Sequence, residues 1–115
     1  MPHNRNKLIV LLIGNHSNTV IHRVLEASVK EDILREHYDK ESLVSFNVAK
    51  KYREMINPVQ RYFSDEDVGE IRKQINRRVK KELELRISKG YEGINLNLIE
   101  QILEEGLEEL NVKGL

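Results

Sequence analysis

The sequence predicts an all-α protein, a compact bundle of about five helices folded as a single domain over residues 1–115. Apolar residues recur at helical spacing along most of the chain, capping residues precede several of these stretches, and only two prolines occur. Hydrophobic residues make up 39% and charged residues 33% of the 115 residues, which is typical of a globular domain.

The N-terminal segment fits more than one element. Lys7–Ile13 contains six consecutive aliphatic residues, which fit a short helix; the alternative is a buried strand over residues 7–13 in an α+β fold. The next residues, Gly14–Asn18, tolerate the backbone angles of turns, so we expect a turn there. A helix should follow from Thr19, capped by Asn18 or Ser17.

Two polar motifs divide the middle of the chain. Ser28–Glu31 has the spacing of a capping box, which predicts that one helix ends and another begins there. Asp39–Glu41 is a polar joint, and Ser42 can cap a helix that should stop near Ile56, ahead of a bridging segment over residues 58–62. The apolar residues of this helix are expected to face the core: Val44, Val48, Tyr52, Met55 and Ile56.

The clearest element is a long helix over about residues 65–89. Ser64 is a good N-cap, Phe63 and Val68 are spaced as a hydrophobic staple, and Gly90 suits the left-handed position after a helix. At 1.5 Å per residue this helix is about 37 Å long. A compact domain of this size is only about 26 Å across, so the helix end either projects or is covered by a second subunit, which favours a homodimer.

A second amphipathic helix is predicted over about residues 98–110, behind a capping box at Asn97–Glu100. Glycine at position 106 costs about 1 kcal/mol of helix propensity relative to alanine, which indicates close approach of another helix. Glutamates occupy the opposite face of this helix. Its apolar face is the predicted helix–helix interface and contains Ile99, Ile102, Leu103, Gly106, Leu107 and Leu110.

Basic residues are concentrated in the middle of the long helix. A rotation of 100° per residue places four of them on one face, which we call the basic face: Lys73, Arg77, Lys80 and Lys81. These four residues span about 12 Å of helix, which matches a few consecutive phosphates of a nucleic acid. The first interpretation is nevertheless a solvated face, or a contact with the acidic last helix, because no aromatic residue lies between the basic ones and the chain contains 19 basic and 19 acidic residues.

No residue pattern indicates catalysis, a metal or a cofactor. The chain has no cysteine, which excludes disulfides and thiolate chemistry. Its four histidines, His3, His16, His22 and His37, are never four residues apart, so the helical spacing of paired metal ligands is absent. Gly14–Asn18 precedes a predicted helix and could present backbone N–H groups to an anion, but it lacks the glycine pattern and the lysine of a P-loop.

Together these observations predict a small non-enzymatic accessory protein that acts through helix surfaces. We expect it in the cytoplasm, as a homodimer or with another protein partner, and without a metal or cofactor. The longest apolar run, Leu8–Ile13, is far too short to cross a bilayer, so no membrane contact is expected. The alternative function is nucleic-acid binding through the basic face.

Overall fold

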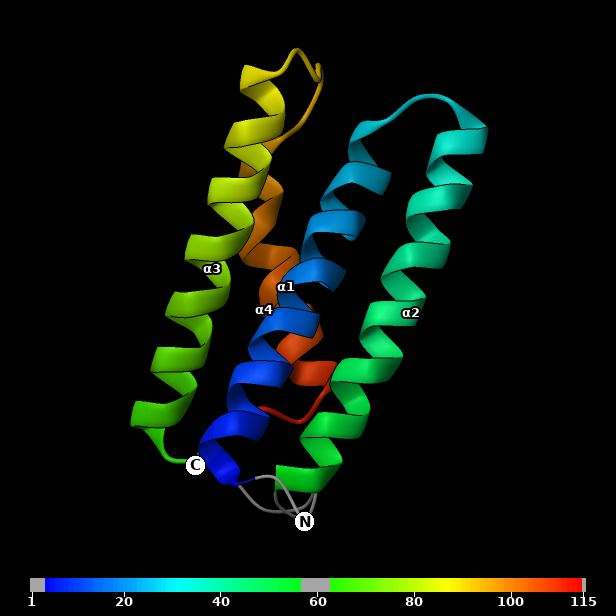
Figure 1. Cartoon of the computed structure of the whole chain (residues 1–115). Coiled ribbons are helices and arrows are strands. Elements are labelled where there is room, and N and C mark those ends of the chain that lie inside the picture. Colours follow the sequence, from blue (N-terminus) through cyan, green and yellow to red (C-terminus); the bar gives the residue numbers. More distant parts are fainter. Residues whose placement is uncertain (1–3, 57–62, 115) are drawn as a thin grey trace.

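The computed structural model describes residues 4–56 and 63–114, which form four α-helices and one short 3₁₀ helix (Figure 1). These elements are α1 (Arg5–Ser28), α2 (Asp32–Ile56), α3 (Asp65–Ser88), η1 (Leu96–Leu98) and α4 (Ile99–Glu109). The described residues contain no strand. The all-α class is therefore confirmed, and the alternative strand at residues 7–13 is wrong because these residues belong to α1. The connection predicted over residues 58–62 lies outside the described residues.

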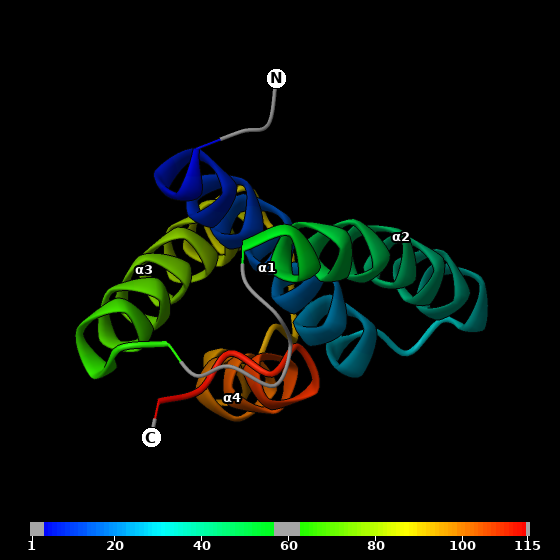
Figure 2. The ribbon, with the colours of Figure 1, turned by 90° about the horizontal axis from the view of Figure 1, so that it is seen from below.

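Three helices of nearly equal length run along one long axis. The molecule measures 41 × 24 × 24 Å, and α1, α2 and α3 have 24, 25 and 24 residues. Viewed end-on, α1 is surrounded by α2, α3 and α4 (Figure 2). Because α3 lies along the long axis of the bundle, its length alone gives no support to a homodimer. No helix in the described ranges is long and apolar enough to cross a membrane.

The hydrophobic core lies around α1. Leu12, Val20 and Val24 of this helix are fully buried, and they meet the apolar stripe of α3 and the apolar face of α4. The stripe of α3 follows the predicted spacing, with Val68, Ile71, Ile75, Val79 and Leu83 all buried. The core is thus built mainly by α1, α3 and α4.

The predicted turn at Gly14–Asn18 is wrong, because these residues lie in the interior of α1. Their polar side chains are satisfied within the helix: Asn15, Ser17 and Thr19 each donate to the carbonyl oxygen four residues earlier, over 2.6–3.1 Å. With other helices on three sides, tertiary packing outweighs the weak local preference for a turn. The predicted cap at Asn18 or Ser17 is therefore wrong as well. The suggested anion site is also wrong, because N–H groups in the interior of a helix are engaged in helix hydrogen bonds.

The middle of the chain has one break where two were predicted. The break between Ser28 and Asp32 is confirmed, although Ser28 is the last residue of α1 and its hydroxyl donates to Val24 O. The second break, at Asp39–Glu41, does not occur, because α2 continues through it and Ser42 is buried against α1. The bundle therefore has four helices where about five were expected.

The predicted ends of α3 are confirmed. Ser64 Oγ accepts the N–H of Asp67 at 3.1 Å, Phe63 and Val68 are both buried, and Gly90 has φ = +101°. The start of the last helix differs from its prediction. Asn95, and not Asn97, supplies the capping oxygen, and it caps η1, from which α4 continues without a side-chain cap.

A buried arginine holds the C-terminal segment. Arg53 of α2 is fully buried, its guanidinium lies 4.6 Å from the ring centroid of Phe63, and its Nε and Nη2 donate to Asn111 O at 3.2 and 3.0 Å. The Phe63 N–H donates to Lys113 O. This arrangement joins the end of α2, the start of α3 and the residues after α4, and burial lowers the pKa of Arg53.

Candidate interaction surfaces

The predicted helix–helix interface of the last helix faces the chain's own core. Ile99, Leu103, Gly106, Leu107 and Leu110 are buried, and Ile102 is half-buried. These residues lie on α4 or at its end, and α4 packs against α1 and α3. This apolar face is therefore occupied within one chain and is not free to bind a second protein.

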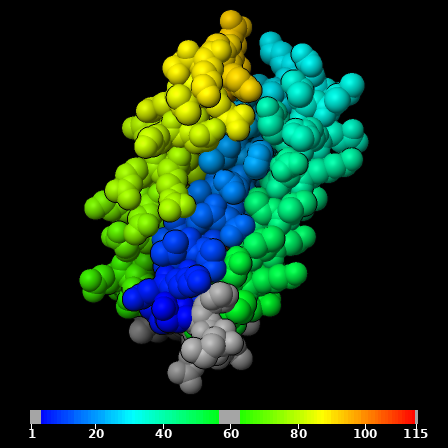
Figure 3. All heavy atoms as spheres, viewed as in Figure 1, coloured from blue at the N-terminus to red at the C-terminus, as the bar shows by residue number. Residues whose placement is uncertain are grey.

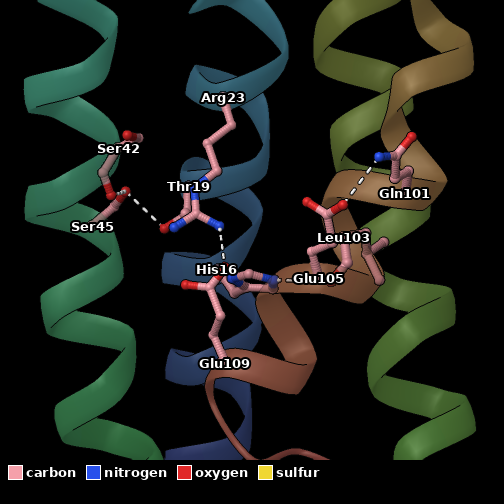
Figure 4. Close-up of polar contacts among 9 residues, drawn as sticks. All are labelled: His16, Thr19, Arg23, Ser42, Ser45, Gln101, Leu103, Glu105 and Glu109. Atoms are coloured by element: carbon pink, nitrogen blue, oxygen red, sulfur yellow. Dashed lines mark hydrogen bonds and ion pairs between the residues drawn. The ribbon is translucent and has the colours of Figure 1, made fainter.

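The close approach expected at Gly106 is made by a histidine ring. His16 of α1 is fully buried and points at α4 (Figure 4). A Cβ built at Gly106 would lie 2.5 Å from His16 Nε2 and nearer still to Cε1, so only glycine leaves room for the ring. His16 Nε2 lies 3.4 Å from Leu103 O, a hydrogen-bond contact in which the ring donates. Sequence reasoning found the glycine but not the histidine that fills the space beside it.

The environment of His16 keeps the ring neutral. Burial lowers its pKa to about 4, the carbonyl of Leu103 raises it, and Arg23 lowers it slightly. Nδ1 has no hydrogen-bond partner among the described residues. Arg23 itself reaches Glu109 of α4, with Nη1 3.4 Å from Oε1 (Figure 4). A neutral imidazole enclosed between two helices acts as a packing element that fixes α4 on α1.

Helix α2 contacts α1 through small residues. Ser42, Ser45 and Ala49 are buried, and the hydroxyls of Ser45 and Thr19 are 2.9 Å apart (Figure 4). Short side chains let the two helices approach closely, and α1 is the helix against which the described part of α2 packs. Four larger side chains of α2 are half-buried and pack against the core beside these small residues: Tyr38, Phe46, Tyr52 and Ile56.

The inward stripe predicted on α2 is wrong at Val44 and Met55, which are 64% and 53% exposed. Its other members, Val48, Tyr52 and Ile56, are half-buried, and the last two pack against the core. The helical wheel found the apolar face correctly but assigned it to the core, because sequence alone does not show that serine and alanine make the contact with α1. The error reveals an apolar face that the described residues leave uncovered.

This face forms a continuous row, which we call the outer stripe of α2. Its members follow one another at alternating spacings of three and four residues, the pattern of a helix that packs lengthwise on another helix. Sequence reasoning identified Val44, Val48 and Met55 of this row but assigned them to the core. The outer stripe comprises Leu34, His37, Glu41, Val44, Val48, Lys51 and Met55, of which only Val48 is half-buried and the rest are exposed.

The outer stripe lies on an open side of the molecule. Figure 2 shows α2 beside α1, on the side away from α3. In the space-filling view α2 forms one edge of the molecule (Figure 3). Because six of the seven residues of the outer stripe are exposed, a second helix could lie along it.

The basic face of α3 is also open. Lys73, Arg77, Lys80 and Lys81 are all exposed, and none forms an ion pair within the described part of the chain. The acidic residues of α4 do not cover them. The ion pair that joins the two helices is made by Arg72 and Glu104, outside the basic face, and this contact raises the pKa of Arg72.

Carboxylates flank the basic face on one side. A groove of about 500 Å³ runs between α3 and α4, and it is lined by Lys73 and Arg77 together with Glu100 and Glu104. The glutamates lower the positive potential around Lys73 and Arg77, which weakens the attraction of this part of the basic face for phosphate. The basic face is thus accessible but electrostatically mixed.

Across residues 4–56 and 63–114 no three histidine, aspartate or glutamate side chains are grouped closely enough to hold a metal ion. Comparisons with protein-family models, with curated proteins and with solved structures find no match.

Proposed function

We propose that this protein is a small non-enzymatic accessory protein that acts through its helix surfaces, and that the outer stripe of α2 is its protein-binding surface. One observation carries the proposal: α2 exposes a lengthwise row in which apolar and charged residues alternate, on a side other than the one that Ser42, Ser45 and Ala49 pack against the bundle. The sequence-based expectation of a homodimer fits this surface.

The exposed row is more than the scattered apolar surface of an ordinary domain. Single exposed aliphatic residues are common and need no explanation. Here Leu34, Val44, Val48 and Met55 share one side of a helix, at the spacing by which a helix recognises another helix. Complete burial of such a side chain stabilises by about 1.5–3 kcal/mol, so even partial burial of several of them favours association.

The test compares two equivalent substitutions. Val44→Lys places a charge in the outer stripe, and Leu85→Lys places one on α3 at a residue of similar exposure, 47% against 64%. We expect light scattering between micromolar and millimolar concentration to show the wild type and Leu85→Lys approaching twice the chain mass of 13.5 kDa, with Val44→Lys remaining at that mass. A monomer at every concentration would contradict the homodimer, and identical behaviour of the two variants would contradict the role of α2.

Nucleic-acid binding through the basic face is the second candidate function, favoured by the exposure of Lys73, Arg77, Lys80 and Lys81. It ranks below protein binding because glutamates line the adjoining groove and the charges of the whole chain balance. Binding to labelled duplex DNA or RNA should fall steeply with salt, and Lys73→Glu with Arg77→Glu should weaken it further than Lys50→Glu on α2. An absence of binding at low salt would exclude this candidate.

A further inference from the structure

We infer that the outer stripe of α2 binds the same stripe of a second copy in antiparallel orientation, with Glu41 of each copy paired to Lys51 of the other. The inference rests on the proposed function and adds to it the identity of the partner and the residues that determine the pairing. The evidence is the order of apolar and charged residues along the stripe.

One antiparallel register matches the six stripe residues from His37 to Met55 with one another. When Glu41 lies opposite Lys51 of the second copy, Val44 lies opposite Val48, and His37 lies opposite Met55. Each of these layers occurs twice, because a two-fold axis repeats every contact. The apolar layers then lie at the centre, and a pair of opposite charges lies on each side of them.

The positions beside the stripe agree with the same register. Residues that flank an antiparallel helix pair meet their equivalents across the interface. On the side of α2 away from α1, this places Lys40 next to Glu54 of the second copy, and Asn47 next to its own equivalent near the two-fold axis. All three residues are exposed, so charge complementarity extends beyond the stripe itself.

Other arrangements place like charges together or bury a charge against an apolar side chain. A parallel pair would set Glu41 against Glu41 and Lys51 against Lys51. An antiparallel pair shifted by seven residues in one direction would set Glu41 against Val44, and in the other direction Lys51 against Val48. Such mismatches disfavour the alternatives, so the sequence of the stripe specifies one pairing.

The fold leaves this pairing sterically open. The side chains that attach α2 to α1, among them Ser42, Ser45 and Ala49, lie on a different side of the helix from the outer stripe. The register overlaps residues 36–56 of both copies, which gives about 30 Å of helix contact at 1.5 Å per residue. The second copy therefore adds to the bundle without displacing α1.

Charge reversal tests the pairing. Glu41→Lys and Lys51→Glu should each weaken dimerisation about tenfold, since each creates two like-charge contacts, and the double variant should restore it. Lys50→Glu is the matched control: it makes the same charge change at the neighbouring exposed lysine, outside the stripe. Sedimentation velocity on the full chain measures the dissociation constants, and circular dichroism verifies that each variant is folded.

Spin labels test the orientation. The chain has no cysteine, so Glu36→Cys and Lys50→Cys each provide a unique attachment site. Both residues project from the same side of α2. In the antiparallel register the paired labels are separated along the helix axis by about 30 Å at position 36 and about 12 Å at position 50, whereas a parallel pair gives equal distances at both positions.

The outcomes separate the two levels of the proposal. Unequal label distances, with weakening by the single charge reversals and recovery in the double variant, would support the inference. A dimer that Val44→Lys dissociates, but that gives equal label distances or ignores charge reversal, would overturn the pairing and leave the proposed surface intact. Absence of any dimer would overturn both the pairing and the homodimer.

Discussion

Replacement of Gly106 by alanine tests the contact that fixes α4 to α1. In an ordinary helix interior this substitution stabilises by about 1 kcal/mol. Here the new Cβ would lie 2.5 Å from His16 Nε2, and the ring is fully buried. We expect overpacking to cost about 3 kcal/mol, and displacement of the ring from Leu103 O to cost about 1 kcal/mol more. The gain in helix propensity offsets about 1 kcal/mol of this cost, so the net destabilisation is about 3 kcal/mol.

The matched experiment makes the same substitution without the histidine. In a His16→Ala background the space beside position 106 is empty, so Gly106→Ala should stabilise by the ordinary amount of about 1 kcal/mol. Urea unfolding, followed by circular dichroism at about 222 nm, measures the free energy of unfolding of the wild type, the two single variants and the double variant. The cycle should then give a coupling of about 4 kcal/mol. Stabilisation of the wild-type background by Gly106→Ala, or equal effects in the two backgrounds, would refute the packing argument.

Three further predictions concern stability. The pKa of His16 is about 4 in the folded chain, below the ordinary histidine value of 6.5, so the unfolded state binds more protons between these values. The free energy of unfolding should therefore fall by up to about 3 kcal/mol as pH decreases through that window. His16→Gln should remove this pH dependence, and a variant with the same pH profile as the wild type would contradict the role of His16. Arg53→Lys should lower the free energy of unfolding by about 1–3 kcal/mol, because an ammonium cannot reproduce the guanidinium hydrogen bonds to Asn111 O; an unchanged urea midpoint would contradict the anchoring role. Asn111 has φ = +57°, so Asn111→Gly should raise the melting temperature slightly, and a lower one would show that its side chain is needed.

The sequence predicted best those features that neighbouring residues determine. The ends of α3 depend on the Ser64 cap and on Gly90, and both can be recognised without knowledge of the rest of the fold. The continuity of α1 through Gly14–Asn18 depends instead on three other helices, which a local preference for turns cannot reveal. Likewise, the orientation of α2 depends on the fit of Ser42, Ser45 and Ala49 against α1.

The candidate surfaces were predictable to different degrees. A helical wheel sufficed to group Lys73, Arg77, Lys80 and Lys81, but their exposure depends on where α4 lies. The outer stripe was hidden for a different reason: its apolar members were visible in the sequence, yet apolar periodicity gives the same signal for a core and for a binding surface. Only the packed structure distinguishes these two uses.

The shallow attachment of α2 has a consequence for how the molecule unfolds. Of its 25 residues four are buried, and Ala49 is the one hydrophobic residue among them, whereas α1 buries ten. Most of the apolar burial that resists unfolding therefore lies in the other three helices. We expect α2 to open, with release of the Arg53 contacts, while the remaining core persists. Its backbone amides should exchange with solvent faster than those of α1. Binding along the outer stripe would slow that exchange, so occupancy of the surface can be read from the local stability of one helix.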